Sequence, residues 1–234
     1  MAAIRLDKYL TVALGISRTE AKVLLKSGGI TVNGVAVRKG DTRIDTDNRV
    51  ELRGEPLIYK EYIYILMNKP EGILSAATDK RVKTVVDILP DHLKRDGLFP
   101  VGRLDKNTTG LLIITDDGDF GHKVMSPKTH TEKCYRAELD GPLREEHKKV
   151  FSEGVTLADG EVCLPAELTF VDSHTALVKV CEGKYHQIKR MFGVVGLGVN
   201  KLHRVSIGKL TLPEDLREGE ARELSQEEIS QILP

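Results

Sequence analysis

The sequence predicts an α+β protein with two domains, and three observations support this prediction. The first 55 residues show two helical patterns, then a hairpin and a short strand, which together make one small α/β unit. Gly54-Glu55-Pro56 breaks this pattern, so we place a linker at about residues 54–61. Residues 62–234 then alternate short strand-like runs with a few helices, and a chain of 234 residues can bury a core in each domain.

The N-terminal domain, residues 1–55, carries two strong local signals. Ser17 followed by Glu20 is a capping box, which predicts that a helix begins there. Asn33-Gly34 lies between alternating apolar residues, which is typical of a hairpin with a type I′ turn. The elements expected in this domain are helices over residues 4–14 and 18–26, a hairpin over 30–37 and a strand over 49–52.

The C-terminal domain, residues 62–234, is predicted from shorter apolar runs. Strands are expected over residues 62–67, 99–101, 111–114, 133–139, 168–171, 176–181 and 200–207. Helices are expected over residues 84–89, 119–125, 143–152 and 186–195, followed by a short helix capped by Ser225 and Glu228. Residues 75–83 and 91–98 are polar or charged, and we expect surface loops there, the first of them mobile.

The charges are balanced over the whole chain but unevenly distributed along it. The formal net charge is zero, yet residues 1–40 hold seven Lys and Arg against two acidic residues. Residues 183–212 hold six Lys and Arg and no acidic residue, whereas residues 213–234 hold seven acidic residues and two basic ones. Two separate basic segments are typical of a protein that binds a polyanion such as nucleic acid.

The remaining composition points to a cytoplasmic protein without a membrane segment. No apolar run approaches the ~18 residues that a membrane-spanning helix needs. The N-terminal stretch interrupts its apolar residues with charged ones, so it does not resemble a signal peptide. The three cysteines, Cys134, Cys163 and Cys181, have neither metal-site nor disulfide spacing, and we expect reduced thiols.

The segment Gly102-Arg103-Leu104-Asp105-Lys106-Asn107-Thr108-Thr109-Gly110 is the best candidate for a functional site. It places one carboxylate, Asp105, in a polar loop between the extended residues 99–101 and the apolar run 111–114. The surrounding Arg, Lys, Asn and Thr side chains suit phosphate and sugar. Carboxylates commonly attack glycosidic bonds or stabilise sugar cations. The structural alternative is that Asp105 only forms a turn, as most loop aspartates do.

This segment resembles the catalytic motif of pseudouridine synthases, in particular the RsuA branch, which acts on ribosomal RNA. The similarity includes Arg103, Leu104, Asp105, Thr109 and Gly110, with the apolar strand in the matching place. The turn Asn68-Lys69-Pro70-Glu71-Gly72 is similar to the one that opens the catalytic domain in this family. The resemblance implies a mostly antiparallel catalytic sheet and Asp105 as the catalytic residue.

The resemblance extends to the residues around the target base. Tyr135 matches the tyrosine that stacks on the base and takes a proton from its carbon 5, and Leu202 matches an apolar wall. Lys189 matches the basic partner of the catalytic aspartate, for which Arg190 is the alternative. Arg103 matches a residue that fills the gap when the uridine flips out.

The N-terminal domain resembles the alpha-L RNA-binding domain of a small-subunit ribosomal protein and tyrosyl-tRNA synthetases. The matching segments are Arg5 to Leu10, Ser17-Arg18 and Gly29 to Gly34. Family resemblance places RNA on the second helix and the hairpin. The expected RNA-binding residues are therefore Arg5, Lys8, Arg18, Lys22, Lys26, Asn33 and Lys39.

Taken together, the two resemblances imply an isomerase that converts uridine to pseudouridine in ribosomal RNA. The expected target is uridine 516 of 16S RNA within a small-subunit assembly intermediate, and the expected enzyme is a monomer. The reaction needs no cofactor and no metal, and the chain shows no metal-ligand cluster, Walker loop or dinucleotide fingerprint. The alternatives are a large-subunit (23S) enzyme of the same family, a non-catalytic RNA-binding assembly factor and a nucleoside hydrolase.

Overall fold

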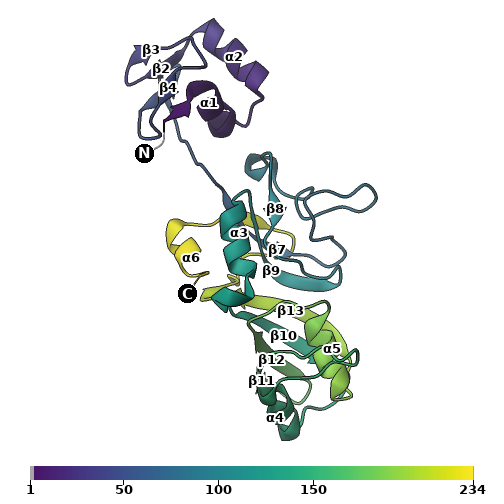
Figure 1. Ribbon diagram of the computed structural model, residues 1–234. Helices are drawn as coiled ribbons and strands as arrows, with labels where there is room; N and C mark the ends of the chain where they lie inside the picture. Colours follow the sequence, from purple (N-terminus) through teal and green to yellow (C-terminus); the bar gives the residue numbers. More distant parts are fainter. Residues whose placement is uncertain (1–2, 234) are drawn as a thin grey trace. The chain divides into compact units, whose positions relative to one another are not determined.

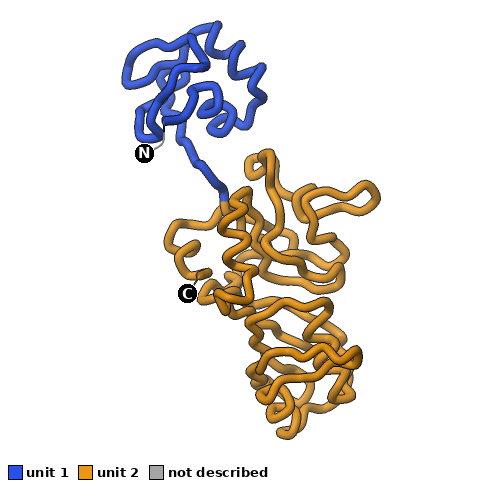
Figure 2. The backbone as a smooth tube through the Cα atoms, viewed as in Figure 1, with its two compact units in different colours: residues 1–63 blue, residues 64–234 orange. Residues whose placement is uncertain are grey.

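The chain forms two units, residues 1–63 and residues 64–234 (Figure 2). The structure is a computed structural model, and it describes residues 3–233. It confirms the α+β class, because both helices and sheets are present in each unit. Among the described residues, no helix is both long and apolar enough to cross a membrane.

The first unit packs two helices against short strands (Figure 1). Its helices are α1 (Leu6–Leu14) and α2 (Arg18–Ser27). Its strands are β1 (Ile4–Arg5), β2 (Ile30–Val32), β3 (Val35–Ala36), β4 (Arg43–Ile44), β5 (Val50–Leu52) and β6 (Glu55–Leu57). β3, β2, β5 and β6 form one sheet, and β1 pairs with β4. Apolar side chains of both helices, including Leu6, Leu10 and Leu25, form the core with Ile30.

Both local signals in this unit are confirmed. The Ser17 side chain accepts a hydrogen bond from the Glu20 N–H, and the Glu20 side chain accepts one from the Ser17 N–H, so the capping box starts α2. Asn33 and Gly34 both have positive φ, 51° and 80°, as a type I′ turn requires. Gly34 adopts this conformation without strain because it has no Cβ.

Three strands of the first unit were not predicted. β1, β4 and β6 are two or three residues long, too short to show an alternating pattern. As a result, α1 begins at Leu6, because Ile4 and Arg5 pair with Arg43 and Ile44 instead. β6 also lies inside the stretch expected as a linker, where it pairs with β5.

The second unit is organised around one sheet of order β11-β12-β10-β13-β9-β7-β15, with β14 paired to β13 and β8 to β9. All pairings are antiparallel except that of β9 with β13, so the expected mostly antiparallel sheet is confirmed. The strands are β7 (Tyr64–Lys69), β8 (Phe99–Pro100), β9 (Thr108–Thr115), β10 (Lys133–Leu139), β11 (Glu167–Phe170), β12 (Thr175–Val180), β13 (Val199–Ile207), β14 (Leu210–Thr211) and β15 (Ala221–Glu223).

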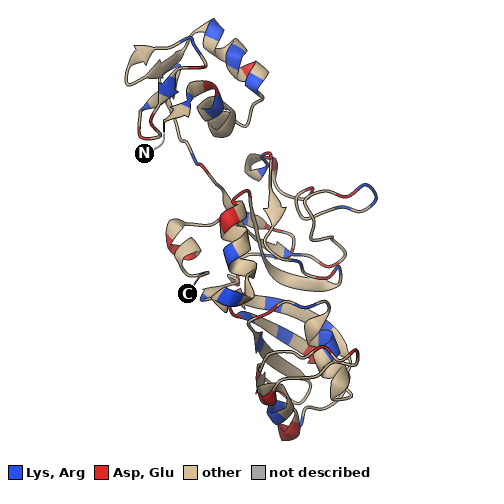
Figure 3. Cartoon of the chain, in the orientation of Figure 1, with Lys and Arg blue, Asp and Glu red and all other residues tan. Residues whose placement is uncertain are grey.

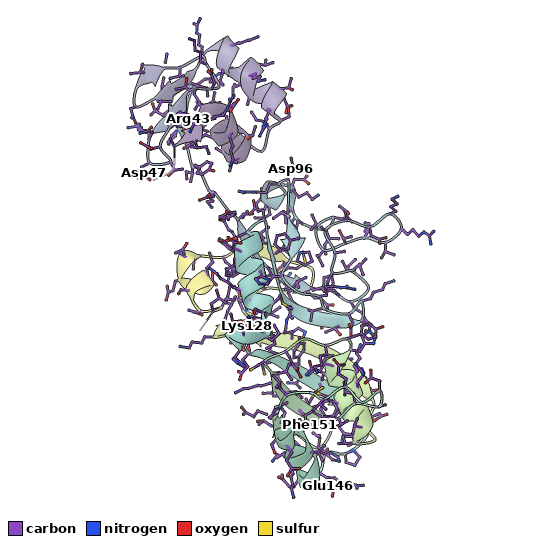
Figure 4. The ribbon with its side chains drawn as sticks, in the orientation of Figure 1. Arg43, Asp47, Asp96, Lys128, Glu146 and Phe151 are labelled. Atoms are coloured by element: carbon purple, nitrogen blue, oxygen red, sulfur yellow. The ribbon has the colours of Figure 1, made fainter. Side chains whose placement is uncertain are left out.

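Helices cover two parts of this sheet (Figure 1). α4 (Glu145–Glu153) and α5 (Gln187–Val194) pack on the β10–β13 part, where the Phe151 ring lies 5.0 Å from that of Phe192 (Figure 4). α3 (Gly118–Met125) and α6 (Gln226–Ser230) pack on the β7–β9 part. Two single-turn helices, η1 (Asp91–Leu93) and η2 (Pro127–Thr129), lie in connections. Residues 110–115 of β9 are all buried, so β9 is an interior strand of the sheet, between β13 and β7.

One predicted element of the second unit is wrong. Residues 84–89, expected as a short helix, form a bridge and a turn. The Asp87 carboxylate accepts hydrogen bonds from the Thr84 N–H and hydroxyl, which resembles a helix cap, but no further turn follows before Pro90. Pro90 disfavours helical backbone at the residue before it, so the segment closes after one turn.

Candidate functional site

Asp105 lies in the connection between β8 and β9, as the sequence predicted. Because β8 pairs with β9, the loop of residues 101–107 is held at both ends by the same central sheet. The Asp105 C=O accepts a hydrogen bond from the Thr108 N–H at 3.0 Å, which closes a turn. The Asp105 side chain is 25% exposed, so its carboxylate can reach a ligand in a cleft.

A buried lysine, Lys69 at the end of β7, donates hydrogen bonds to the backbone of this loop. The residue is fully buried, and its Nζ donates to the carbonyls of Pro70 at 2.9 Å, Thr108 at 3.0 Å and Lys106 at 3.4 Å. Burial lowers the pKa of Lys69 to about 8, and the negative charges of Asp105 and Glu218 oppose this shift. The Asn-Lys-Pro turn was recognised in the sequence, but nothing there showed that the lysine points inward.

Two further contacts fix the backbone around Asp105. Leu104 and Ser75 are joined reciprocally, because the Ser75 hydroxyl donates to the Leu104 C=O at 2.8 Å and accepts from the Leu104 N–H at 3.1 Å. The Gly72 N–H donates to the Lys106 C=O at 2.8 Å. The catalytic loop candidate is therefore anchored on both sides of Asp105, as a preorganised site needs.

Two side chains near the start of α5 approach the Asp105 carboxylate. Lys189 Nζ lies 3.3 Å from Asp105 Oδ2 and donates to Asn107 Oδ1 at 2.6 Å. His186 Nε2 lies 3.4 Å from Asp105 Oδ1. His186 has a positive φ of 49° at the N-cap of α5, a conformation that is uncommon outside glycine and asparagine. Its proximity to Asp105 was not expected from the sequence.

Arg190, the alternative partner of Asp105, points elsewhere. Its guanidinium lies 2.5 Å from Asp159 Oδ2 and 3.1 Å from Glu161 Oε2, both in the connection before β11. Helical spacing explains the difference, because consecutive residues of α5 face directions about 100° apart. Of the two basic residues, the structure brings Lys189 and not Arg190 to Asp105.

A pocket of about 210 Å³ opens beside the Asp105 carboxylate. Its volume is below the range typical of drug-sized ligands, about 300–1,000 Å³, and suits a small group such as one base. Tyr135 of β10 and Leu202 of β13 form part of its wall, on adjacent strands. The pocket is lined by Gly102, Arg103, Leu104, Asp105, Thr108, Met125, Lys133, Tyr135, Val180, Glu182, Gly183, Lys184, His186, Gln187, Ile188, Leu202 and Arg204.

The structure thus brings together most of the residues predicted for the site. Asp105, Tyr135, Lys189 and Leu202 converge here, Leu202 being nearly fully buried. Arg103 lines the same pocket with an exposed side chain. The sequence analysis did not assign several lining residues with polar side chains to the site, among them Lys133, His186 and Arg204.

The other carboxylates near the site have structural partners. Asp117 accepts hydrogen bonds from the Phe120 N–H at 3.0 Å and from the Tyr64 hydroxyl at 2.7 Å, so it caps α3. Asp116 pairs with Arg95. Glu182, which lines the pocket, accepts from the Leu164 N–H and from Gln187 Nε2, both at 2.8 Å.

The first unit gathers most of the predicted RNA-binding lysines and arginines around two hollows. Figure 3 shows Lys and Arg repeated along α2. A hollow of about 760 Å³ is lined by Arg5, Lys8, Arg18, Lys22 and Arg43 among others, and a second hollow of about 350 Å³ by Arg5, Lys22, Lys26 and Arg38. Arg38 and Arg43 were not predicted, because their separation along the chain hides their proximity to α2.

Two predicted RNA-binding residues do not line these hollows. The Asn33 side-chain oxygen accepts a hydrogen bond from the Arg49 N–H at 2.9 Å, so this residue stabilises its own turn. Lys39 lies in the connection before β4, outside both lining sets. Within the lining set, Arg5 donates to both oxygens of Asp7, and this pairing lowers the pKa of Asp7.

Two protein families match this chain. Residues 63–193 match the RNA pseudouridylate synthase family, and residues 4–50 match the S4 domain. A crystal structure described as pseudouridylate synthase aligns with a TM-score of 0.69 and 35% identity, over 98% of this chain and 99% of that one.

Curated relatives match over nearly the full length. The ribosomal small subunit pseudouridine synthase A of Vibrio cholerae is 42% identical over 230 residues, which cover 98% of this chain and 99% of that protein. The protein of the same name from Escherichia coli is 36% identical, with 98% and 100% covered. A Bacillus subtilis protein named as an uncharacterized RNA pseudouridine synthase is 40% identical, with 97% of each chain covered.

Proposed function

The chain belongs to the RNA pseudouridylate synthase family and carries an S4 domain, and from that premise we propose that it isomerises one uridine of small-subunit ribosomal RNA to pseudouridine, with Asp105 as the catalytic carboxylate. The observation that carries this proposal is the setting of Asp105, a carboxylate with two basic partners at the mouth of a base-sized pocket. The expected target is uridine 516 of 16S RNA.

The neighbours of Asp105 suggest a role for each residue. Lys189 holds the carboxylate aimed at the sugar carbon C1′. The Tyr135 ring stacks on the uracil base, and its oxygen takes the proton that leaves carbon 5 as the hydroxyl releases its own proton to solvent, which supplies the proton that N1 gains. Leu202 forms the apolar wall beside the base, and Arg103 occupies the gap that the flipped uridine leaves in the RNA.

An isomerase fits this pocket better than a hydrolase. Most glycoside hydrolases use two carboxylates about 5–9.5 Å apart, one of which must give or take a proton. Glu182 is the other carboxylate in the pocket lining, and it already accepts two hydrogen bonds and lies 3.6 Å from Lys184. A single free carboxylate suits a reaction in which the base leaves and rejoins the same sugar without water.

The choice of RNA rests on the names of the relatives and on the first unit. Relatives from Vibrio cholerae and Escherichia coli are named for the small ribosomal subunit. The basic surface of the S4 domain supplies phosphate contacts from Arg5, Lys8, Arg18, Lys22 and Lys26, which hold the RNA in register. Every residue that this proposal uses lies in one chain, so a monomer suffices. We expect it to act in the cytoplasm on a partly assembled subunit.

The first test is pseudouridine mapping of ribosomal RNA by carbodiimide modification and reverse-transcriptase stops. We compare cells that lack the protein with the same cells carrying the wild type, Asp105→Asn or Asp96→Asn. Asp96 is an exposed carboxylate of the same unit (labelled in Figure 4), so its substitution is the matched control. We expect one small-subunit stop, lost on deletion and restored by the wild type and Asp96→Asn but not by Asp105→Asn.

The other outcomes separate the alternatives. A lost large-subunit stop keeps the chemistry and overturns the target. An unchanged pattern in every strain contradicts the ribosomal RNA substrate, and restoration by Asp105→Asn contradicts the role of this carboxylate. With purified protein, Asp105→Asn should bind the target RNA as tightly as the wild type and lose at least about 10³-fold in rate.

A further inference from the structure

Arg204 of β13 is a buried cation with unused hydrogen-bonding capacity. The residue is only 3% exposed. Its Nε donates to the Leu111 C=O at 2.7 Å, and its Nη1 donates to the Tyr135 hydroxyl at 3.3 Å. Among the described residues, its Nη2 is buried and has no hydrogen-bond partner. A guanidinium carries five N–H groups, so several of them are unpaired here.

A second buried cation, Lys133 of β10, lies close enough to be affected by Arg204. Lys133 is also 3% exposed, and its Nζ has one weak contact, 3.4 Å from the Val124 C=O. Burial lowers the pKa of Lys133, and the positive charge of Arg204 lowers it further. Within residues 3–233, no carboxylate lies within 4.0 Å of Lys133 or Arg204.

Buried charges without counter-charges are unfavourable, and both of these line the pocket beside Asp105. Such an arrangement is retained where a ligand supplies the negative charge. An RNA phosphate is one source of that charge, but the pocket that the two cations line is also lined by the apolar side chains of Val180, Ile188 and Leu202, which suit a base. The base itself therefore fits this position better than a phosphate.

We propose that Arg204 and Lys133 form an anion-stabilising site for the uracil base while it is detached from the ribose. This inference rests on the proposed isomerase function. When the bond between N1 and C1′ breaks, its electron pair leaves with the uracil, and the negative charge is shared by N1 and the carbonyl oxygens O2 and O4. The Asp105 carboxylate balances the positive charge at C1′. Preorganised N–H donors in a dry pocket stabilise such developing charge strongly.

The symmetry of uracil makes one fixed site sufficient for the whole reaction. Turning the ring by half a revolution about the line through N3 and C6 exchanges N1 with C5 and O2 with O4. A carbonyl oxygen thus occupies the same place before and after the turn, and Arg204 can bind either one without moving. C5 then bonds to C1′, C5 loses its proton and N1 gains one, so the product is an isomer of the substrate.

The test compares Arg204→Gln and Lys133→Met with the wild type, and Lys201→Gln is the control. Lys201 is an exposed cation of the same strand, outside the pocket lining. We measure single-turnover isomerisation of a target RNA fragment, RNA affinity and thermal unfolding. Loss of one such donor typically costs about 10²–10³-fold in rate. We expect a loss of that order for Arg204→Gln, a loss in the same direction for Lys133→Met, and unchanged RNA affinity.

A second substrate separates charge stabilisation from a merely structural role. Fluorine at carbon 5 withdraws electrons, so a 5-fluorouracil anion needs less help to leave. We measure consumption of the target nucleoside by chromatography of digested RNA, with uridine or 5-fluorouridine at that position. The Arg204→Gln loss should be at least about tenfold smaller with 5-fluorouridine than with uridine.

Two results overturn the proposal: an equal loss of rate with uridine and with 5-fluorouridine, or an Arg204→Gln rate equal to that of the wild type. In either case Arg204 has only a structural role between its neighbouring strands. If Arg204→Gln does not fold, Lys133→Met is judged by the same comparison. A wild-type protein that isomerises no uridine would instead contradict the proposed function.

Discussion

Lys69 illustrates how one buried residue can set the position of a reactive loop. Its ammonium group donates hydrogen bonds to three carbonyls. Two of these carbonyls belong to residues 106 and 108, on the C-terminal side of Asp105. The charged group is costly to bury, because burial lowers its pKa to about 8 even though the nearby charges of Asp105 and Glu218 raise it. The hydrogen bonds of Lys69 to these carbonyls offset this cost, and they also fix the position of the Asp105 loop.

We expect Lys69→Met to reduce activity far more than stability. The substitution removes the Lys69 donor from the carbonyls of Pro70 and Thr108, at about 1–3 kcal/mol each, whereas the Lys106 C=O keeps its hydrogen bond from the Gly72 N–H. It also removes the cost of burying a charge. A loop displacement near 1 Å costs on the order of 100-fold in rate. Single-turnover rates and melting curves check this, with the exposed Lys149→Met as control. A full rate with a lowered melting temperature would contradict the positioning role.

The sequence predicted the residues that belong to recognisable motifs and missed those defined by contacts across strands. Asp105 was predictable because a polar, glycine-bounded loop directly precedes an apolar run. Arg204 and Lys133 were not, because their burial follows from the pairing of β10 with β13, which brings Tyr135 opposite Arg204. His186 approaches Asp105 only because α5 starts with a residue of positive φ.

Elements were predicted well where a local rule is sufficient. The strand over residues 133–139 and the cap at Ser225 are confirmed, because alternation and a capping box act within a few residues. The parallel pairing of β9 with β13 lies beyond such rules. At Gly110 the φ is 102°, and a Cβ would overlap the backbone of Arg204, so the glycine permits this close approach.

An ion pair between β15 and α6 makes stability sensitive to acid. Arg222 of β15 donates to both oxygens of Glu228, at 2.6 and 2.9 Å, and this lowers the pKa of Glu228 from 4.5 to about 2. A carboxyl whose pKa falls on folding stabilises the protein above its unfolded pKa. That contribution is lost as the pH falls from about 4.5 towards 2.

We therefore expect the stability difference between the wild type and Glu228→Gln to shrink as the pH falls. Glutamine keeps a side-chain oxygen for the Ser225 N–H but loses the charge that pairs with Arg222. Urea unfolding at about pH 6 and about pH 3 measures the difference directly, and other carboxylates cancel in the comparison. A difference that stays constant between the two pH values would show that the ion pair does not stabilise this helix.

At the scale of the whole molecule, RNA binding and chemistry belong to separate units. The proposed phosphate contacts lie in residues 1–63, and Asp105 and its partners lie in residues 64–234. Phosphate contacts release counterions, so each one adds to the salt dependence of binding. Affinity for RNA and the rate on bound RNA should therefore respond to different substitutions.

Lys22→Gln should weaken RNA binding and make it less sensitive to salt. Lys22 lines both hollows of the first unit, as does Arg5, whose guanidinium is already paired with Asp7. Loss of one phosphate contact reduces the slope of log affinity against log salt by about 0.7–0.9. Binding titrations at several salt concentrations measure this slope, and Lys149→Gln on α4 is the control. The rate at saturating RNA should not change, and an unaltered slope would exclude Lys22 from the contact.

The pairing of β15 with β7 has a consequence for how the protein is made. Met67 pairs in register with Ala221, about 150 residues later, and the backbone of Asn68 is hydrogen-bonded to Gly219 and Glu220. At about 5–20 residues per second, a ribosome needs roughly 8–30 seconds to make that intervening stretch. The first unit, whose contacts are local in sequence, can fold during this interval. The first unit can thus be folded before the pairing of β15 with β7 is complete, so the two units reach their folds at different times during synthesis.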